Sequence, residues 1–270
     1  MDSRPIGVFD SGLGGLTAVA ALKKLLPDEN IIYFGDTARM PYGTKSIPAL
    51  REIAEEDLEF VAGYGVKAII AACGTVSSAA PDILKNFRVP VFNVIDSPVR
   101  KAAAVSGSAP IGVIATEASI KSGVFLQKIT ALCPEREIIA LPCQDFVSLI
   151  ESGHTDISDP AVSLCVENSL RPLKGKGLSA LLLGCTHFGF IAEAISVYLG
   201  ADVELISASA CAAESACDYL MSNSLTGGSG ELSFITSGDR ERFISLSSRL
   251  LGYDTSCRTI HIETPEWRRI

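Results

Sequence analysis

Short apolar runs alternate with longer amphipathic stretches along the 270-residue chain, and this alternation restricts the possible folds more than any other feature. The short runs are apolar at nearly every position, as in strands covered on both faces of a parallel sheet. They occupy residues 6–9, 31–34, 68–72, 91–94, 111–115, 138–141, 180–183, 203–206 and 232–235. Apolar residues at helical spacing occupy 16–26, 47–64, 117–132, 161–170, 192–199, 209–221 and 239–250. The pattern predicts an α/β fold with mainly parallel sheets flanked by helices.

Two distant segments of the chain resemble each other. Residues 68–75 and 180–187 are each a buried strand that ends in a cysteine, Cys73 or Cys185, with a threonine one or two residues later. Their separation is too long for a solenoid repeat, so it predicts two pseudo-symmetric α/β domains. Ligands of such sheets bind at the carboxyl ends of the strands, which places the active site in the cleft between the domains. We expect a first domain of residues 1–97 plus 208–270, and a second domain of residues 98–207.

The composition excludes several classes of partner. The net charge is −8, whereas a protein that binds nucleic acid needs a basic surface, so no nucleic-acid partner is expected. The pair Arg268–Arg269 follows acidic residues and is expected to be a solvated end. No apolar run approaches the roughly 20 residues of a membrane span, and the first residues lack the pattern of a secretory signal. We therefore expect a cytoplasmic protein without a membrane partner.

The cysteines give no indication of disulfides or of a metal centre. All eight are expected to stay reduced in a chain without an export signal, and none forms a CxxC pair or a zinc-type cluster with histidine. No metal site and no cofactor is therefore expected. Six of them are expected to be small apolar side chains in the interior: Cys133, Cys143, Cys165, Cys211, Cys217 and Cys257.

A glycine-rich turn follows the first predicted strand, at residues 10–15. Its glycines let the backbone approach a ligand, and the N–H groups of the next helix would face an anion or an amino acid. The alternative is a tight turn in which Asp10 or Ser11 only caps the helix, and the turn itself does not decide between the two. The glycine spacing does not match the dinucleotide-binding pattern GxGxxG.

A polar loop follows the second predicted strand, at residues 35–43. Its proline and glycines fix a path that would present backbone donors to a carboxylate. Arg39 is a candidate carboxylate clamp. We favour the alternative that Arg39 pairs with Asp36 or with another acidic side chain and only shapes the loop.

Cys73 and Cys185 are the candidate reactive groups. A thiol at a strand end is often inert packing, but two thiols in matching surroundings favour a role in proton transfer, because local charge brings a thiol pKa into a useful range. His187 follows Cys185 closely and is expected to orient or protonate it; the alternative is a structural histidine whose hydrogen bonds are satisfied within the fold. His154 and His261 lack such neighbours, and His261 lies in an alternating run where it should face outward.

Taken together, these motifs resemble the glutamate racemases. The matching segments are residues 9–16, 33–43, 72–75 and 183–187, with a weaker match at 115–123. The resemblance extends from Ile6 to about Ser209. It implies two α/β domains that face each other across a cleft, and a homodimer. It also implies interconversion of L- and D-glutamate without pyridoxal phosphate or metal, with D-glutamate supplied to peptidoglycan synthesis.

The resemblance also implies roles for individual residues. Cys73 and Cys185 would be the two bases, assisted by Asp10 and His187 respectively. The residues that would line the site of glutamate, or of a related acidic amino acid, are Asp10, Ser11, Pro41, Tyr42, Gly43, Gly74, Thr75, Ser119, Thr186 and His187. Racemisation removes the Cα proton on one face and returns a proton on the other, so it needs two groups on opposite sides of the substrate.

This sequence departs from the family pattern near both thiols. Gly74 stands where the family has asparagine after the first cysteine, and a lost hydrogen bond to a charged group costs about 1.5–3 kcal/mol. Phe188 and Gly189 stand where tyrosine and proline are usual. Residues 95–98 and 142–146 also differ from the usual Pro-Gly and Cys-Pro pairs.

These departures leave other functions open. One is racemisation of aspartate or another small amino acid, and another is a catalytically weakened paralogue that binds amino acids. A phosphate-binding or redox protein on the same scaffold is disfavoured by the glycine spacing and by the lack of CxxC.

Overall fold

The computed structural model describes residues 2–262 and contains two parallel sheets. Residue 1 and residues 263–270 lie outside the described part, and so does the predicted solvated end at Arg268–Arg269. The first sheet has the order β10-β9-β2-β1-β3-β4, and the second has the order β6-β5-β7-β8. Every strand pair within the two sheets is parallel, which confirms the predicted fold class.

Helices cover both faces of the first sheet, whose strands are β1 (Ile6–Asp10), β2 (Ile31–Gly35), β3 (Ala68–Ala71), β4 (Val91–Asn93), β9 (Leu232–Thr236) and β10 (Thr259–His261). One face packs against α1 (Leu16–Leu25), α11 (Ala208–Ser222) and α12 (Arg240–Leu251), through side chains such as Leu16, Ala212 and Phe243. The other face packs against α2 (Ile47–Ala62), α3 (Gly74–Ala79) and α4 (Pro81–Asn86). The largely apolar sequences of β1, β2, β3 and β9 are therefore explained by burial on both faces.

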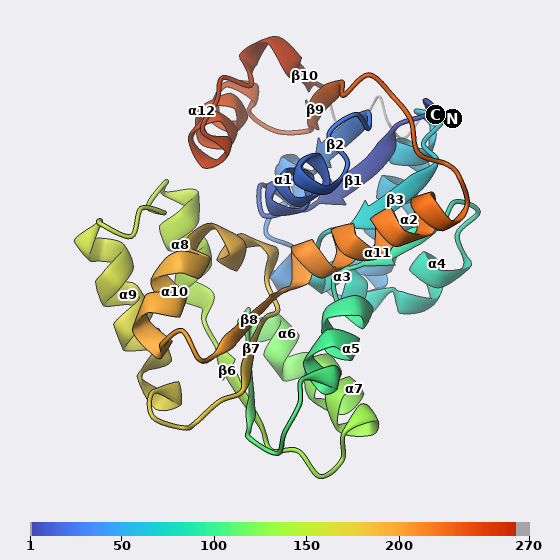
Figure 1. Cartoon of the computed structure of the whole chain (residues 1–270). Coiled ribbons are helices and arrows are strands. Elements are labelled where there is room, and N and C mark those ends of the chain that lie inside the picture. Colours follow the sequence, from blue (N-terminus) through green and yellow to red (C-terminus); the bar gives the residue numbers. More distant parts are fainter. Residues whose placement is uncertain (1, 263–270) are drawn as a thin grey trace.

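The second sheet is enclosed in the same way, and its strands are β5 (Ile111–Ala115), β6 (Ile138–Pro142), β7 (Ala180–Leu183) and β8 (Glu204–Ser207). One face packs against α8 (Gln144–Glu151), α9 (Pro160–Leu170) and α10 (Ala192–Leu199). The other face packs against α5 (Asp96–Ala104) and α7 (Val124–Leu132), through Val99 and Ile129. Figure 1 shows this sheet below the first one, with α3 and α6 (Glu117–Ser122) between them.

The two sheets share one strand order. The sequence β2-β1-β3-β4 of the first sheet corresponds to β6-β5-β7-β8 of the second, and β9 and β10 are added beyond β2. Cys73 follows β3 by two residues, and Cys185 follows β7 by two residues, so the thiols occupy equivalent places. We propose that residues 1–97 with 208–270 form one domain and 98–207 the other. The division is supported by the segregation of β5 to β8 into a sheet of their own.

Several helices differ from the sequence prediction. The helix expected over 117–132 is interrupted at Gly123, whose φ of 69° ends α6 before α7 begins. The pattern did not predict α3, α4, α5 or α8, which have six to nine residues each. Short 3₁₀ helices occur at η1 (Thr37–Arg39), η2 (Tyr42–Thr44), η3 (Arg171–Leu173), η4 (Thr186–Ile191) and η5 (Ser256–Arg258).

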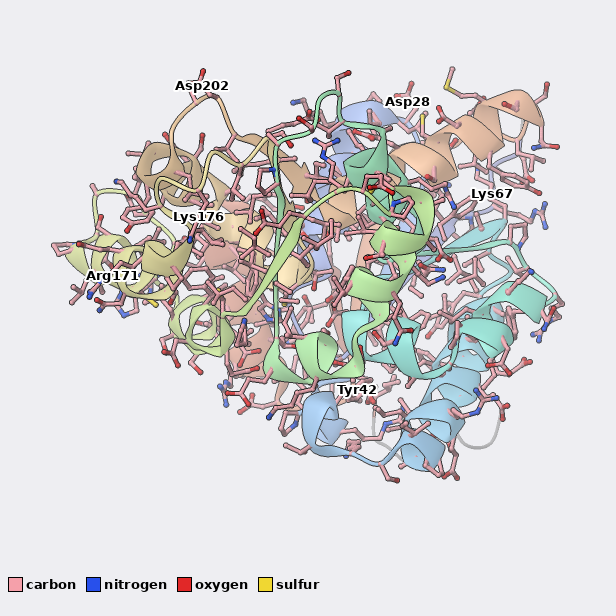
Figure 2. The ribbon with its side chains drawn as sticks, turned by 90° about the horizontal axis from the view of Figure 1, so that it is seen from below. Asp28, Tyr42, Lys67, Arg171, Lys176 and Asp202 are labelled. Atoms are coloured by element: carbon pink, nitrogen blue, oxygen red, sulfur yellow. The ribbon has the colours of Figure 1, made fainter. Side chains whose placement is uncertain are left out.

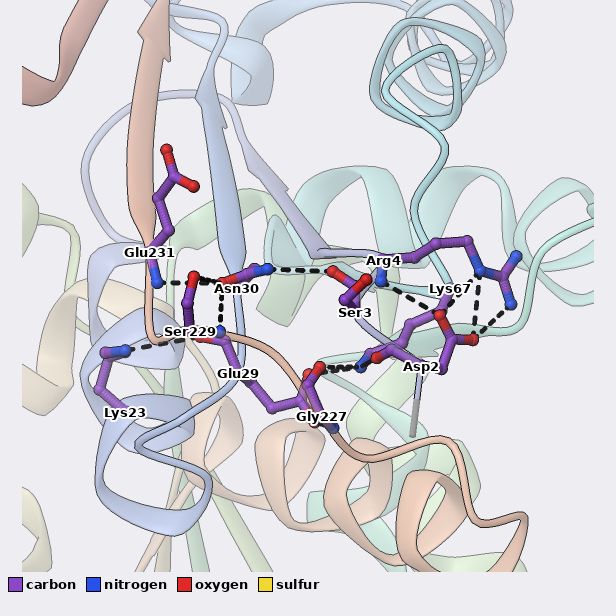
Figure 3. A network of polar contacts seen from close by, with 10 residues as sticks. All are labelled: Asp2, Ser3, Arg4, Lys23, Glu29, Asn30, Lys67, Gly227, Ser229 and Glu231. Carbon is purple, nitrogen blue, oxygen red and sulfur yellow. Dashed lines mark hydrogen bonds and ion pairs between the residues drawn. The ribbon is translucent and has the colours of Figure 1, made fainter.

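A polar network fastens the loop between α11 and β9 to the amino-terminal ends of the first sheet's strands (Figure 3). The Glu29 carboxylate accepts from the backbone N–H of Gly227 at 2.7 Å and pairs with Lys67 at 2.5 Å. Lys67 also donates to the carbonyl oxygens of Asp2 and Gly227. The network therefore joins four segments that are far apart in the sequence, at Asp2, Glu29, Lys67 and Gly227.

The six cysteines expected in the interior differ in burial: Cys143, Cys211 and Cys217 are buried, Cys133 and Cys165 are partly buried, and Cys257 is exposed, so the expectation is wrong for Cys257. All eight cysteines lie within residues 2–262, and each is a free thiol. Within that range, no helix combines the length and the apolar character needed to cross a membrane.

Candidate active site

A cavity of about 580 Å³ lies between the carboxyl ends of the two sheets and contains every site residue that the sequence predicted. Its walls come from segments that follow β1, β2 and β3 on one side, and β5, β6 and β7 on the other. The predicted residues in its lining are Asp10, Ser11, Pro41, Tyr42, Gly43, Cys73, Gly74, Thr75, Ser119, Cys185, Thr186 and His187. The cavity therefore brings both thiols to one enclosed space.

Cys73 stands at the junction of β3 and α3 and is only 5% exposed. Its Sγ donates to Ser11 Oγ at 3.7 Å and faces the backbone N–H groups of Thr75 and Val76. Burial, together with the nearby Asp10 carboxylate, raises the pKa of the thiol to about 12. Cys73 is therefore a protonated thiol in the resting protein at neutral pH.

Asp10 is the last residue of β1 and is buried between the two walls of the cavity. Its Oδ1 accepts from Gly12 N at 2.8 Å and from Ser11 Oγ at 3.2 Å. Its Oδ2 accepts from Thr186 Oγ1, also at 3.2 Å, which links the two walls. Burial raises the pKa of Asp10, although the charge of His187 and these hydrogen bonds act in the opposite direction.

Cys185, His187 and Glu151 form a chain of contacts on the second wall. Cys185 Sγ lies 3.7 Å from His187 Nδ1, and His187 Nε2 lies 3.2 Å from Glu151 Oε1. Burial lowers the pKa of His187, but the hydrogen bonds to Cys185 and Glu151 outweigh that effect and raise it to about 10. His187 is therefore an imidazolium at neutral pH and gives Cys185 a charged hydrogen-bond donor.

Glu151 is the site residue that sequence reasoning missed. It ends α8, a helix of only eight residues whose buried residues are Phe146 and Ile150. A carboxylate aimed at His187 cannot be recognised from spacing along the chain, because 36 residues separate the two. Other cavity residues that were not predicted include Met40, Thr44, Thr116, Glu117, Lys121, Gln144, Val147 and Ser148.

The loop after β2 forms a rigid part of the first wall. Arg39 contacts Asp36, Glu56 and Asp57, which confirms the prediction that it pairs with acidic side chains and shapes the loop. Tyr42 is 2% exposed, and its hydroxyl contacts the same acidic cluster. Pro41 and Gly43 flank it in the cavity lining.

Of the departures that the sequence analysis named beside the thiols, Gly74 alone belongs to the cavity lining. A Cβ at Gly74 would lie 3.4 Å from the Gly184 carbonyl oxygen and 3.8 Å from Ser119 Oγ, so a side chain there has room. Phe188 packs instead in the interior against Phe146, with ring centroids 5.2 Å apart. A Cβ at Gly189 would meet Thr17, away from the cavity. Gly74 is therefore the departure that faces the cavity, whereas Phe188 and Gly189 follow His187 in η4 without lining the cavity.

The remaining histidines and the acidic side chains do not form a metal site in the described part. Between residues 2 and 262 there is no group of three or more His, Cys, Asp and Glu side chains with the geometry to hold a metal ion. His154 Nδ1 lies 2.6 Å from Asp159 Oδ2 in the turn before α9. His261 is exposed on β10, as predicted.

The comparisons with known proteins agree with this geometry. Over residues 17–216 the sequence matches the family described as Asp/Glu/Hydantoin racemase. The chain belongs to this racemase family. Its relatives include a glutamate racemase of Syntrophus aciditrophicus, 37% identical, with 92% of this chain and 93% of the relative covered. Membership places the chain among the isomerases.

Solved structures of the racemase family match almost the whole fold. The glutamate racemase of Thermus thermophilus in complex with beta-chloro-D-alanine is 37% identical, with a TM-score of 0.86, covering 98% of this chain and 100% of that one. The glutamate racemase of Francisella tularensis in complex with D-glutamate is 38% identical, with a TM-score of 0.85, covering 97% and 98%. The fold of the family thus extends over the cavity and both sheets.

Proposed function

We propose that this racemase interconverts L- and D-glutamate by a two-base mechanism that needs no cofactor. One observation carries the proposal: Cys73 and Cys185 follow equivalent strands of two matching sheets, and both line one cavity. The similarity to glutamate racemases over more than nine-tenths of the chain supports glutamate as the substrate.

The two thiols divide the work of moving the proton. One sulfur takes the proton from Cα, and the thiol on the opposite side delivers its own proton to the other face of the planar carbanion. The Cα–H bond on one face of the substrate breaks, and a new Cα–H bond forms on the opposite face. The product is therefore the mirror image of the substrate, and the two thiols have exchanged protonation states. In the resting protein Cys73 carries its proton, which equips it to act as the acid.

The neighbouring groups support each thiol. The His187 imidazolium sits beside Cys185, and Asp10 and Ser11 sit beside Cys73. The carbanion intermediate needs preorganised hydrogen-bond donors around the substrate carboxylates and exclusion of water. Hydroxyl groups of Ser11, Thr75, Ser119 and Thr186 line the cavity and are suited to that role, together with the walls at Pro41–Gly43 and Gly74.

We further propose the setting of this reaction, on the basis of the resemblance to the family. The D-glutamate would be supplied to peptidoglycan synthesis and so contribute to the cell wall and to cell shape. The protein would act in the cytoplasm as a homodimer.

Isotope exchange tests the proposal most directly. Protein purified without pyridoxal phosphate is incubated with each glutamate enantiomer in D₂O, and incorporation of deuterium at Cα is followed together with optical rotation. We expect exchange and inversion from both enantiomers. If neither enantiomer exchanges even at high protein concentration, the proposed function is wrong.

Two single substitutions separate the bases. Cys73→Ala and Cys185→Ala should each abolish racemisation, because each removes one of the two proton-transfer groups. Elimination from a substrate analogue with a good leaving group needs one base only, so each variant should retain it with one enantiomer and lose it with the other. Retained racemisation in either variant would contradict the two-base mechanism.

Racemisation of aspartate or another small amino acid is the second candidate, and Gly74 is the observation that favours it. Glycine leaves free volume between Gly184 and Ser119 in the cavity wall, so the fit to glutamate is less constrained there. The same exchange measurement over a panel of amino acids decides between them. Binding of acidic amino acids without exchange would instead indicate a binding protein that has lost turnover.

A further inference from the structure

A buried acidic cluster lies directly behind the cavity wall that carries Tyr42. Asp36 and Asp57 are completely buried, and Tyr42 is nearly so. Arg39 donates through three different nitrogens to Asp36, Glu56 and Asp57, so that one positive charge is shared among three carboxyl groups. Figure 2 shows Tyr42 on the short η2 helix at the edge of the fold, next to α6.

The hydrogen bonds around the Tyr42 hydroxyl point to a second proton in the cluster, besides the one on Tyr42. The Tyr42 hydroxyl lies within hydrogen-bond distance of two carboxyl oxygens, Asp36 Oδ2 and, at 3.0 Å, Asp57 Oδ2. A phenol has one hydrogen and can donate to only one of them. The second contact is a hydrogen bond only if the other carboxyl group is protonated and donates to the phenol oxygen.

The donors around the two aspartates decide which one holds that proton. Asp36 accepts from Arg39 Nε, from the Tyr42 hydroxyl and from Ser237 Oγ, the last at 2.7 Å. Asp57 accepts from Arg39 Nη2 on Oδ1, and among residues 2–262 the hydrogen-bond partner of its Oδ2 is the tyrosine hydroxyl. Asp36 therefore receives more hydrogen bonds than Asp57, and Asp57 is the carboxylic acid of the pair.

We propose that Asp57 is a positioning residue: as a neutral carboxylic acid it donates to Tyr42 and thereby fixes the Pro41–Gly43 wall against the substrate. Asp57 lies on α2, does not line the cavity and touches no reacting atom, so it acts through Tyr42. The role rests on the proposed racemase function, since the wall is useful only if substrate binds there.

The electrostatics of the cluster agree with the geometry. Burial raises the pKa of Asp57 well above its usual value, and the charge of Asp36 adds to the effect, while Arg39 opposes it. The groups that face Asp57 are Asp36, Arg39, Tyr42 and Glu56. When the pH rises far enough to remove the proton from Asp57, two carboxylates share the single hydrogen of the Tyr42 hydroxyl. The wall then loses the hydrogen bond between Asp57 and Tyr42. The KM for glutamate should then rise.

Three substitutions test the proposal through kinetics. Asp57→Leu keeps the volume without a donor, and we expect KM for both enantiomers to rise about tenfold or more while kcat changes less. Asp57→Asn restores the donor through its amide, so KM should return to within about twofold of the wild type. Glu56→Gln is the matched control, because Glu56 touches Arg39 but not Tyr42, and its KM should stay unchanged.

The pH profile gives a readout that a purely structural role would not move. The rise of KM on the alkaline side should be present in the wild type and absent in Asp57→Asn, since an amide does not titrate. An unchanged KM in Asp57→Leu, or a KM raised equally in Asp57→Asn, would overturn the proposal.

A measurement without substrate separates this proposal from the proposed function. Infrared difference spectra of the wild type and Asp57→Asn at neutral pH should show the loss of a protonated carboxyl band. Loss of a carboxylate band instead would overturn the proposal even if the racemase is active. A wild type without any racemase activity, but with the protonated band, would overturn the proposed function and with it the catalytic part of this role.

Discussion

Gly74 leaves one position of the cavity wall without a side chain. It is the first residue of α3, directly after Cys73, and a Cβ there would meet only the Gly184 carbonyl and Ser119 Oγ, at distances that need little adjustment. Its backbone lies in a helix rather than in the left-handed region, so other residues are sterically allowed. A larger side chain would therefore fit at position 74.

We predict that Gly74→Asn increases kcat/KM for glutamate about tenfold or more, because the amide adds a hydrogen bond to a charged substrate group. Steady-state racemisation of both enantiomers measures the effect. Gly74→Ala is the control, since it adds the Cβ without the amide and should give no comparable gain. Equal kinetics for the two variants would show that the missing amide does not limit this enzyme.

Glu151 gives a second prediction at the scale of one side chain. His187 has a pKa of about 10, raised by hydrogen bonds to Cys185 and Glu151 against the effect of burial. Because the folded value lies above the unfolded one, the stabilisation is complete below about pH 6.5 and disappears as pH rises through about 10. Catalysis that depends on the imidazolium should follow the same alkaline limit.

We expect Glu151→Gln to move the alkaline limb of kcat/KM down by about one pH unit, since the imidazolium loses a charged partner. The pH–rate profile measures the shift. Glu117→Gln is the matched control, because Glu117 also lines the cavity but pairs with the exposed Lys121. If both variants kept the alkaline limb of the wild-type kcat/KM profile, His187 would not be the group that controls that limb.

At the scale of elements, the strands were predictable and the short helices were not. All nine predicted strands occur within one residue of their expected bounds, because each contains a short, largely apolar run, and β1, β3, β5 and β7 are buried at every position. The break at Gly123 could not be predicted from periodicity, since the apolar pattern continues across it. The breaking feature is a left-handed backbone conformation that glycine permits but does not require.

Those site residues that lie at strand ends could be predicted from the sequence. Asp10, Cys73 and Cys185 each end or closely follow a strand, so a parallel sheet necessarily brings them to one edge. Glu151 and Asp57 come from helices, and their distance from His187 and Tyr42 depends on how those helices pack. Only tertiary structure reveals such contacts.

The start of α1 packs directly against the turn that carries the second thiol. A Cβ at Gly14 would lie 2.3 Å from Thr186 Oγ1 and 2.5 Å from His187 Nδ1, so the two elements can approach only because residue 14 is glycine. Thr17 Oγ1 adds a contact to the Thr186 carbonyl oxygen at 3.1 Å. The first wall therefore fixes the position of groups on the second.

We predict that Gly14→Ala lowers kcat at least about tenfold, because the methyl group displaces Thr186 and His187 from Asp10 and Cys185. Gly7→Ala is the matched control: its Cβ would clash equally, at 2.3 Å, but with Val61 in the core. The control should lower the melting temperature and leave kcat of the folded protein intact. A Gly14→Ala variant with wild-type kcat would contradict this coupling.

On the scale of the whole molecule, the two ends of the first sheet have different tasks. The carboxyl ends of its strands carry Asp10 and Cys73, whereas the amino-terminal ends carry the buried Glu29–Lys67 pair. Lys67 immediately precedes β3, and Cys73 follows the same strand. Figure 2 likewise shows Lys67 away from Tyr42. Stability and catalysis should therefore respond separately to substitutions at the two ends.

Lys67→Met should destabilise the fold by about 3–5 kcal/mol and leave kcat/KM nearly unchanged. The substitution leaves the Glu29 charge buried and removes the donor to the carbonyl oxygens of Asp2 and Gly227, which tie the chain's start and the loop before β9 to the sheet. Urea unfolding gives the free energy, and racemisation of the folded protein gives the kinetics.

Two further variants make the Lys67 prediction specific. Lys101→Met breaks an ion pair with Glu214 whose partners are both more than two-fifths exposed, so it should change stability by about 1 kcal/mol at most. Adding Glu29→Leu to Lys67→Met removes the orphaned charge and should recover much of the lost stability, because burying two apolar groups is often no worse than burying an ion pair. If the double variant were as unstable as Lys67→Met alone, the loss would come from the loop and chain-start contacts rather than from the uncompensated carboxylate.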